Sequence, residues 1–300
     1  METCISFVIG ATESPRISLF FKRLRIGTLR WLLPEILTAV LVIGALAFAG
    51  NAGAADFEYS GDKGPAFWAE QDPALWGACG GTANGFLQQS PIDISGVEIN
   101  PRLHKLHLTL LETPINMFND GHVIQIEYEP GSTLQFGGVT YILAQFHFHT
   151  LSEHTVGGEH GVMELHAVFQ DNLVNPTKIA VVGTIYKIGR ANSFLQELID
   201  AGLPENSMSS PVQGNPINLA DALTDTAAYY TYQGSLTTPP CSETVTWIVL
   251  KRQAQMSKEQ FQAFRNILGN DFRPLQDRHD RRIEATAKGG RGEAYGHDND

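Results

Sequence analysis

Two segments whose side chains alternate between apolar and polar constrain the fold of this chain more than any other feature. In QFHFH, residues 145–149, two phenylalanines fall on one face of an extended strand, and His147 and His149 fall on the other, because side chains alternate with period two. In Val162–Gln170 a wholly apolar face stands opposite a face that carries His166. Each strand thus buries one face in a core and presents imidazoles from the other. If the two strands are neighbours, three histidines converge.

Further segments rich in β-branched and aromatic residues, bounded by Gly, Pro, Asn or Asp, also predict strands. The predicted strands are Val123–Glu129, Tyr141–His149, Val162–Gln170, Ile179–Ile188 and Thr244–Lys251. Helical periodicity is confined to short pieces. The clearest is Lys258–Leu268, which Ser257 and Gln260 introduce as a capping box, and a weaker one is Ser193–Ala201. The pattern predicts a mainly β fold with short helices, a single domain around one large sheet.

Composition and charge narrow the class of protein. Of the 300 residues, 43% are hydrophobic and 18% are charged, which is typical of a folded globular chain and excludes wholesale disorder. The formal net charge of −11 repels phosphate backbones, so nucleic acid is not an expected partner. We expect a small, neutral or metallic partner instead.

The N-terminus predicts export. Four basic residues between positions 22 and 30 precede the uncharged apolar run Ile36–Gly50 and the small residues Ala52-Gly53-Ala54, the layout of a signal peptide over residues 1–54. The run is shorter than the roughly 20 residues that span a bilayer, so we expect no stable membrane span in the mature form. Residues 55–287 then form the folded domain, and the polar, Gly-rich residues 288–300 form a flexible tail. The expected location is the periplasm or the extracellular space.

Cysteine usage agrees with export. Cys4 lies in the predicted leader, which leaves Cys79 and Cys241 as an even pair in the mature chain. Two cysteines in an exported protein form a disulfide more often than they stay free, and two buried thiols are the alternative interpretation.

Three imidazoles on one face are the ligand set of a catalytic zinc, with the fourth position open to water. Gln145 and Glu164 each precede a candidate ligand by two residues on the same face, where they can accept an imidazole N–H and fix the ring. This arrangement favours a metal site over histidines that are merely hydrogen-bonded. A competing metal site remains open, because His147, His149 and Glu153 have the spacing of the first cupin motif. The Pro-x-Gly turn of the second cupin motif is missing from the sequence before the third histidine.

An ordered set of motifs points to a family. The motifs are QFHFH, SEHTV, MELHAVF and GSLTTPP, with NDGH upstream, VTWIVLK downstream, and GPAFW and QQSPIDI near the N-terminus. From about Tyr59 to Ile283 the chain resembles an α-class carbonic anhydrase. The resemblance implies one domain around a central, largely antiparallel twisted β-sheet of about ten strands, with zinc held by His147, His149 and His166. It also implies that zinc-bound hydroxide converts carbon dioxide reversibly to bicarbonate and a proton.

The resemblance assigns roles to residues around the zinc. Thr237 is expected to accept a hydrogen bond from zinc-bound hydroxide and to donate its own to Glu153. His122, placed at the start of a strand after a turn, is expected to pass the released proton to buffer. Gln145 and Glu164 correspond to the acceptors that orient the first and third ligands.

The remaining correspondences concern the walls of the cleft and the disulfide. The apolar wall for carbon dioxide and the neighbouring bicarbonate-site hydroxyl correspond to Val168, Val181, Leu236, Trp247 and Thr238. Polar residues that order water correspond to Tyr59, Asp120 and Gln125. Cys79 and Cys241 fall where exported bacterial members carry a disulfide.

Three departures from animal members, Phe57, Asp120 and Thr150, leave these correspondences intact, since none is a zinc ligand. The alternative function is a catalytically silent relative that serves as a zinc-binding or interaction module. Such relatives typically lose a zinc-binding histidine, whereas all three histidines are present in this sequence.

Overall fold

The structure is a computed structural model that describes residues 56–207 and 211–287. These residues belong to one compact unit, Asn51–Asp300. The predicted leader, 1–54, and the predicted tail, 288–300, lie outside the described residues. Within the described ranges, no helix has both the length and the apolar character that crossing a membrane requires.

One large sheet dominates the described part of the chain, and ten of its 13 strands lie on a continuous path. In spatial order these are β12 (Val212–Ile217), β4 (Thr113–Asn119), β5 (Ile124–Glu127), β7 (Val139–His149), β10 (Met163–Gln170), β11 (Ile179–Ile188), β14 (Val245–Leu250), β13 (Tyr229–Gly234), β16 (Glu284–Ala285) and β2 (Glu98–Ile99). The other three are β3 (His107–Thr109), β6 (Thr133–Phe136) and β15 (Ala254–Met256). A small separate sheet contains β1 (Asp93–Ile94), β8 (Thr155–Val156) and β9 (Glu159–His160).

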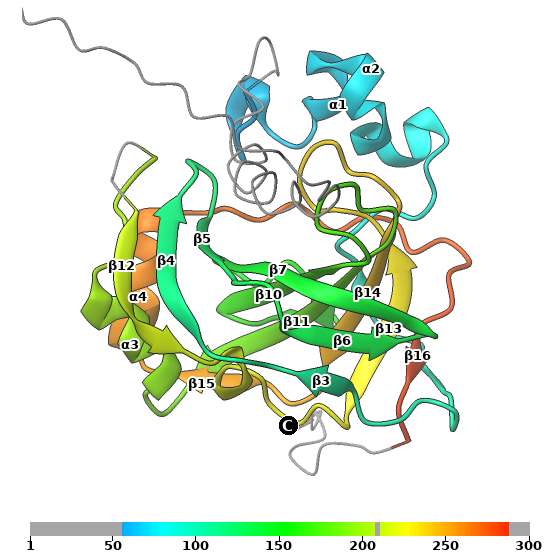
Figure 1. Ribbon diagram of the computed structural model, residues 1–300. Helices are drawn as coiled ribbons and strands as arrows, with labels where there is room; N and C mark the ends of the chain where they lie inside the picture. Colours follow the sequence, from blue (N-terminus) through cyan, green and yellow to red (C-terminus); the bar gives the residue numbers. More distant parts are fainter. Residues whose placement is uncertain (1–55, 208–210, 288–300) are drawn as a thin grey trace, which may run out of the picture. The chain divides into compact units, whose positions relative to one another are not determined.

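The predicted fold class is confirmed. Most neighbouring strands of the large sheet run antiparallel, and the parallel pairs are β11 with β14, β11 with β15, and β16 with β2. The twisted sheet runs through the centre of this unit, and the helices lie at its periphery (Figure 1). The described chain is therefore mainly β with short helices.

The helices are short, as predicted. They are α1 (Trp68–Gln71), α2 (Pro73–Trp76), α3 (Ser193–Ala201) and α4 (Lys258–Leu268), with 3-10 turns at η1 (Gly61–Lys63), η2 (Gly77–Asn84) and η3 (Leu219–Asp221). Helices α3 and α4 have the predicted bounds, and the capping box of α4 forms between Ser257 and Gln260. Strand β11 also has its predicted bounds, whereas β5 begins only at Ile124, one residue later than predicted.

The two faces of β7 meet different surroundings, as its alternation predicts. Phe146 and Phe148 enter the main core, where Phe148 lies 4.9 Å from Phe264 of α4 and Phe146 lies 5.7 Å from Phe194 of α3, measured between ring centroids. The opposite face of the sheet carries the polar residues and a second apolar cluster that includes Val168 and Trp247. Helices α3 and α4 therefore cover the face of the sheet opposite to the histidines.

A third apolar cluster joins the N-terminal helices to a distant loop. Trp68 and Trp76 pack against Cys79 and Cys241, which form a disulfide. This agrees with the pairing that the sequence predicts. The bond connects η2 to the loop between β13 and β14, and so ties the N-terminal segment to the histidine-bearing side of the sheet.

Candidate active site

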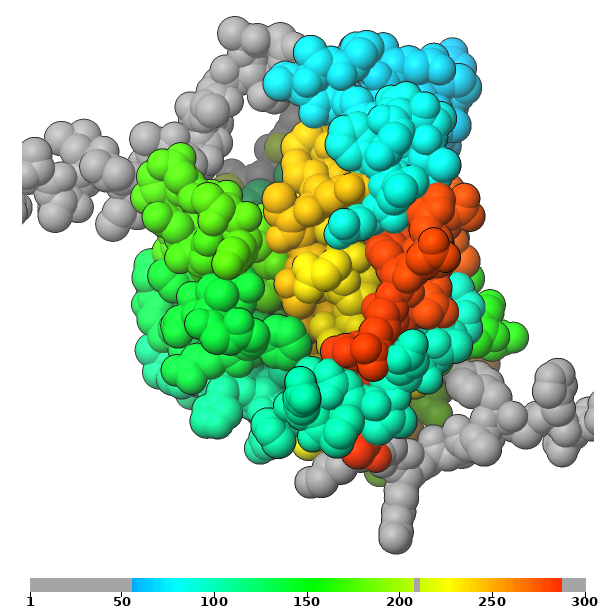
Figure 2. Space-filling model, turned by 90° about the vertical axis from the view of Figure 1, so that its right-hand side faces the viewer, coloured from blue at the N-terminus to red at the C-terminus, as the bar shows by residue number. Residues whose placement is uncertain are grey.

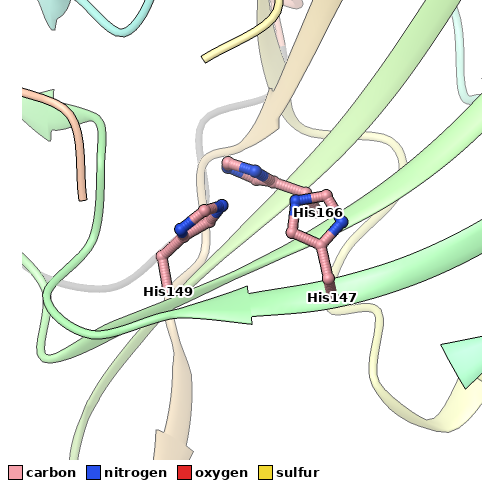
Figure 3. Close-up of side chains that lie close together, drawn as sticks. All are labelled: His147, His149 and His166. Atoms are coloured by element: carbon pink, nitrogen blue, oxygen red, sulfur yellow. The ribbon is translucent and has the colours of Figure 1, made fainter. Parts of the chain in front are cut away.

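The pairing of β7 with β10 brings the three predicted histidines together. These strands are antiparallel neighbours, with His166 opposite His147. The ring centroids lie 5.0 Å apart for His147 and His149, 5.2 Å for His147 and His166, and 4.8 Å for His149 and His166. One nitrogen from each ring lies within 4.8 Å of the others, and the rings surround a common point (Figure 3). This group could hold a metal ion.

Two of the three rings contact a hydrogen-bond acceptor at Nδ1, and the third lies beside a carboxylate oxygen at Nε2. His147 Nδ1 lies 2.9 Å from Gln145 Oε1, and His149 Nδ1 lies 2.6 Å from the carbonyl oxygen of Asp271. His166 Nε2 lies 3.1 Å from Glu164 Oε1. Since an imidazole has two nitrogens, the second nitrogen of each ring remains as a ligand atom.

The electrostatics of the site favour neutral imidazoles at two of the three positions. Desolvation lowers the pKa of His147 well below its usual value, and the neighbouring histidines lower it further. Desolvation also lowers the pKa of His166, against the opposite influence of Glu164. Burial acts in the same direction on His149, but the carboxylates of Glu153 and Asp271 outweigh it and raise the pKa of that ring.

Glu164 connects the third histidine to a polar network behind it. Its Oε1 lies 2.8 Å from His154 Nδ1, and its Oε2 accepts a hydrogen bond from the His154 amide at 2.9 Å. The carboxyl group needs the space beside Gly183, where an added Cβ would come within 2.8 Å of Oε1. Burial alone would raise the pKa of Glu164, but His154 and His166 lower it well below its usual value.

The network continues from His154 through Tyr232 to Ser90. His154 Nε2 lies 2.7 Å from the Tyr232 hydroxyl, which lies 2.9 Å from Ser90 Oγ. An added Cβ at Gly234 would come within 2.2 Å of Ser90 Oγ, so a glycine is required there. Three segments far apart in the sequence therefore support the acceptor of His166.

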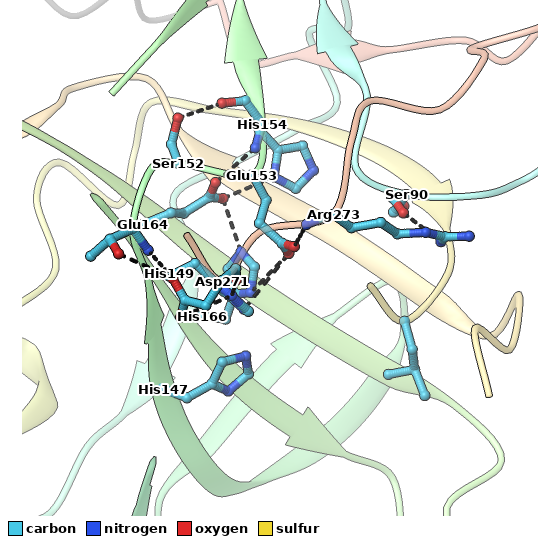
Figure 4. Close-up of polar contacts among 12 residues, drawn as sticks. Ser90, His147, His149, Ser152, Glu153, His154, Glu164, His166, Asp271 and Arg273 are labelled. Carbon is cyan, nitrogen blue, oxygen red and sulfur yellow. Dashed lines mark hydrogen bonds and ion pairs between the residues drawn. The ribbon is translucent and has the colours of Figure 1, made fainter. Parts of the chain in front are cut away.

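Glu153 lies on the other side of the histidines, and both of its oxygens are buried. Its Oε1 accepts a hydrogen bond from the Arg273 amide at 2.8 Å, whereas its Oε2 has no hydrogen-bond partner among the described residues. The Arg273 side chain is 1% exposed and donates to the Ser90 carbonyl (Figure 4). It also donates to Gln89 and to the Cys79 carbonyl. Burial lowers the pKa of Arg273 to about 10.

The threonine loop lies between β13 and β14. Thr237 is 6% exposed, and the amide of Cys241 donates to the Thr238 carbonyl at 2.9 Å. Ser235 anchors the start of the loop, because its hydroxyl accepts a hydrogen bond from the Ser90 amide at 2.9 Å. Within the described part of the chain, no hydrogen bond joins the Thr237 hydroxyl to Glu153. In Figure 2 the cyan N-terminal segment lies beside the yellow-to-orange and red segments, in agreement with the disulfide and with the Arg273 hydrogen bonds.

The predicted apolar wall is continuous beside the histidines. Val168 of β10 pairs with Val181 of β11, which pairs with Trp247 of β14. Leu236 packs against the same cluster. The ring centroids of Trp247 and His166 are 4.8 Å apart, so the wall directly adjoins the imidazoles.

Two of the predicted water-ordering residues belong to β5 or to the turn before it: Gln125 lies on the strand and Asp120 in the turn. Gln125 pairs with His147 across β5 and β7. The prediction that His122 starts a strand is wrong, because β5 begins at Ile124. His122 instead belongs to the preceding turn, where Asp120 Oδ1 accepts its amide hydrogen at 2.8 Å. The alternation of β5 therefore does not decide which way the His122 ring faces.

Two aromatic side chains from the N-terminal segment surround His122. The Phe57 ring stacks on it with 3.8 Å between centroids and 12° between planes, and the Tyr59 ring meets it edge-on at 6.5 Å. Tyr59 also lies 6.5 Å from His149, so it stands between the turn and the three histidines. Burial raises the pKa of Tyr59 well above 10, and the charge of Glu153 raises it further.

Four residues of this region were not predicted as site residues: His154, Tyr232, Asp271 and Arg273. Asp271 accepts from His149 through its carbonyl, and Arg273 fixes Glu153. The SEHTV motif contains His154, so the sequence held a signal for that residue alone. The sheet described above also excludes the cupin alternative, which requires a jelly roll.

Comparisons with known proteins agree with this geometry. A family model described as eukaryotic-type carbonic anhydrase matches residues 63–287. A carbonic anhydrase of Nostoc sp. is 32% identical over 230 residues, which cover 75% of this chain and 84% of that protein. A carbonic anhydrase of Klebsiella pneumoniae is 36% identical over 218 residues, which cover 69% and 85%. The solved complex of an α-carbonic anhydrase from Thermovibrio ammonificans with the inhibitor sulfanilamide has a TM-score of 0.71 and 35% identity, and covers 77% of this chain and 100% of that one. The chain therefore belongs to the eukaryotic-type, or α-class, carbonic anhydrase family, and is an enzyme.

Proposed function

We propose that this protein catalyses the reversible hydration of carbon dioxide to bicarbonate and a proton, with a zinc ion held by His147, His149 and His166. The observation that carries the proposal is the convergence of three imidazoles, each of which has a ring nitrogen within 4.8 Å of those of the other two. Catalytic zinc sites use three protein ligands and keep one position open. The donor set therefore fits zinc.

A buried polar atom without a partner supports the same fit. His149 Nε2 is buried and has no hydrogen-bond partner among the described residues, which is costly unless a ligand occupies it. When bound, zinc supplies a Lewis acid that makes hydroxide available near neutral pH. Carbon dioxide is a weak electrophile toward water, so this chemistry is what the hydration needs.

We assign the orientation of the attacking oxygen to Thr237 and Glu153. In the zinc-loaded enzyme the Thr237 hydroxyl would accept a hydrogen bond from that oxygen and donate its own proton to Glu153 Oε2, the carboxylate oxygen that lacks a partner within the described residues. Arg273 holds the opposite oxygen of Glu153 in place. The hydroxyl is thereby fixed as an acceptor, which orients a lone pair toward the substrate.

Carbon dioxide, a small apolar molecule, rests against the apolar wall. The wall is formed by Val168, Val181, Leu236 and Trp247, and Thr238 provides the next hydroxyl for bicarbonate. The released proton passes to the imidazole of His122 through water ordered by Tyr59, Asp120 and Gln125. The disulfide and the predicted leader support export to the periplasm or the extracellular space.

The test is zinc content together with a stopped-flow carbon dioxide hydration assay on the purified protein. We expect one zinc per chain and hydration activity in the native protein, and loss of most zinc and nearly all activity in His166→Ala. His107→Ala, at an exposed histidine on β3, is the matched control and should retain both. Full zinc and full rate in His166→Ala would overturn the ligand assignment. Zinc without hydration in the native protein would identify a silent binding module.

A further inference from the structure

The end of β7 is fastened to the segment after α4 through Thr150, which directly follows His149. The Thr150 amide donates to Asp271 Oδ1 at 2.7 Å, and its hydroxyl oxygen lies 2.6 Å from the Gly269 carbonyl oxygen and 3.1 Å from Asp271 Oδ1. In the other direction, the Asp271 amide donates to the Thr150 carbonyl at 3.4 Å. Thr150 is fully buried and Asp271 is 2% exposed. These bonds fix the chain immediately after His149.

Asp271 also contacts the His149 ring. Its carbonyl oxygen lies 2.6 Å from His149 Nδ1, and its carboxylate Oδ2 lies 3.8 Å from the same nitrogen (Figure 4). Among the described residues, Oδ2 has no hydrogen-bond partner. A buried carboxylate oxygen without a partner costs free energy, so packing alone would favour a neutral side chain here.

A second carboxylate meets His149 from its other nitrogen. Glu153 Oε2 lies 3.7 Å from His149 Nε2, and this oxygen also lacks a hydrogen-bond partner within the described ranges. Arg265 donates to the Thr150 carbonyl at 3.1 Å rather than to Asp271. Two buried acidic groups on either side of one ring repel each other unless a positive charge lies between them. A divalent cation at the histidines would supply that charge.

We propose that the Asp271 carboxylate is a positioning group that fixes His149 as a zinc ligand. It acts through two contacts: Oδ1 holds the peptide after His149 by way of Thr150, and Oδ2 lies 3.8 Å from Nδ1 of the ring. The proposal rests on the zinc site proposed above. The backbone carbonyl of Asp271 is the direct acceptor of the ring, and the carboxylate supports it by fixing the adjoining chain through Thr150. Mutation of groups that support a metal ligand in this way typically costs about 10- to 100-fold in metal affinity.

Asp271→Asn is the informative variant, because it keeps the size and one acceptor oxygen but removes the charge. Asp171→Asn is its matched control. Asp171 Oδ1 accepts the amide of Thr177 at 2.9 Å, and its Oδ2 accepts the Thr177 hydroxyl at 2.6 Å, at an exposed turn between β10 and β11. The control therefore changes the same kind of aspartate–threonine contact away from the three histidines.

Two measurements on the full-length protein distinguish a specific effect on the position of His149 from a general loss of stability. The first is the zinc dissociation constant by chelator competition, for which we expect Asp271→Asn to be weaker by about 10-fold or more and Asp171→Asn to match the native protein. The second is the visible absorption spectrum after replacement of zinc by Co²⁺, which reports on ligand geometry. We expect altered bands in Asp271→Asn alone.

The outcomes are distinguishable. If the native protein binds no zinc at the three histidines, the proposed function fails. If the native protein binds zinc and Asp271→Asn stays within twofold of it with unchanged cobalt bands, only the role of Asp271 is overturned. Equal loss of affinity in Asp171→Asn would also overturn that role, because the effect would then be general. Thermal melting of each apo variant verifies that it is folded.

Discussion

Removal of the disulfide between Cys79 and Cys241 provides a quantitative test of how the threonine loop is held. The bond joins residues 162 positions apart, and both are buried, at 6% and 0% exposure. In the chain-entropy model, closure of a loop of this length stabilises the folded state by about 5 kcal/mol at 25 °C. This is an upper value, because strain in the folded state reduces it.

That magnitude is large relative to the total stability of a domain, which is roughly 5–15 kcal/mol. For a domain of this size, each 1 kcal/mol shifts the melting temperature by about 2–4 °C, so we expect Cys79→Ala/Cys241→Ala to melt roughly 10–20 °C lower. The pair also packs against Trp68 and Trp76. Loss of two sulfur atoms from this cluster acts in the same direction.

The disulfide should affect activity before it affects zinc. Cys241 lies in the same loop as Thr237, and its amide donates to the Thr238 carbonyl. The carbonyl of Cys79 accepts a hydrogen bond from the Arg273 side chain, and the backbone amide of Arg273 donates to Glu153. The three histidines, in contrast, stand on paired central strands. Without the disulfide, the loop between β13 and β14 should therefore displace the Thr237 hydroxyl, while the three imidazoles keep their positions on the paired strands.

The assay is thermal melting, hydration rate and zinc content of the native protein with and without a phosphine reductant, beside the double alanine variant. We expect the reductant to lower the melting temperature and the rate of the native protein, and to leave the variant unchanged. Thiol titration of the unfolded, unreduced native protein should find no free thiols among Cys79 and Cys241. A melting temperature that falls by less than about 3 °C on removal of the bond would refute the loop-entropy argument.

Three further predictions concern single side chains. His122→Ala should slow hydration by up to about 10²-fold in dilute buffer, and added imidazole should partly restore the rate; equal loss in every buffer would make His122 structural. Glu153→Gln should lower the hydration rate by roughly 10²-fold at unchanged zinc content, because an amide cannot replace both acceptor oxygens, and an unchanged rate would remove Glu153 from the mechanism. Burial alone would raise the pKa of Asp93, but hydrogen bonds with Ser95 and Thr155 outweigh it and lower the pKa. Asp93 therefore contributes stability above its unfolded pKa that is lost as pH falls through the folded value, so Asp93→Asn should lower the melting temperature at pH 7 and progressively less toward pH 3.

The elements that carry the histidines were predictable from local patterns. Alternation in residues 145–149 and 163–170 depends only on the two-residue period of a strand, and the face assignments that it predicts agree with the observed pairing and with the division of the side chains between the main core and the histidine-bearing face. The capping box at Ser257 likewise depends on contacts three residues apart. Such signals survive in a single sequence because the interacting residues are close along it.

Other elements gave no local signal. Strands β4 and β12 were not predicted, because Pro114 and Pro216 interrupt their patterns; the two prolines face each other near the edge of the sheet, where a missing N–H is tolerated. Helices α1 and α2 have four residues each, too few for a helical period to appear. His122 was predicted at the start of a strand, but the turn before it extends further, because Asp120 Oδ1 accepts the amides of both His122 and Val123.

Gln145 and Glu164 lie two residues from the histidines that they contact and were predictable. Asp271 and Arg273 come from far along the chain, and that separation explains why local patterns missed them. Asp271 reaches His149 across 122 positions, and Arg273 reaches Glu153 across 120. The proposed ligands are thus predictable from local patterns in two strands, whereas the contacts of Asp271 and Arg273 form only in the complete fold. It follows that substitutions remote in sequence, at Asp271 or at the disulfide, can alter zinc affinity or rate with all three histidines intact. Retention of the three histidines in a relative therefore does not by itself establish that the relative is active.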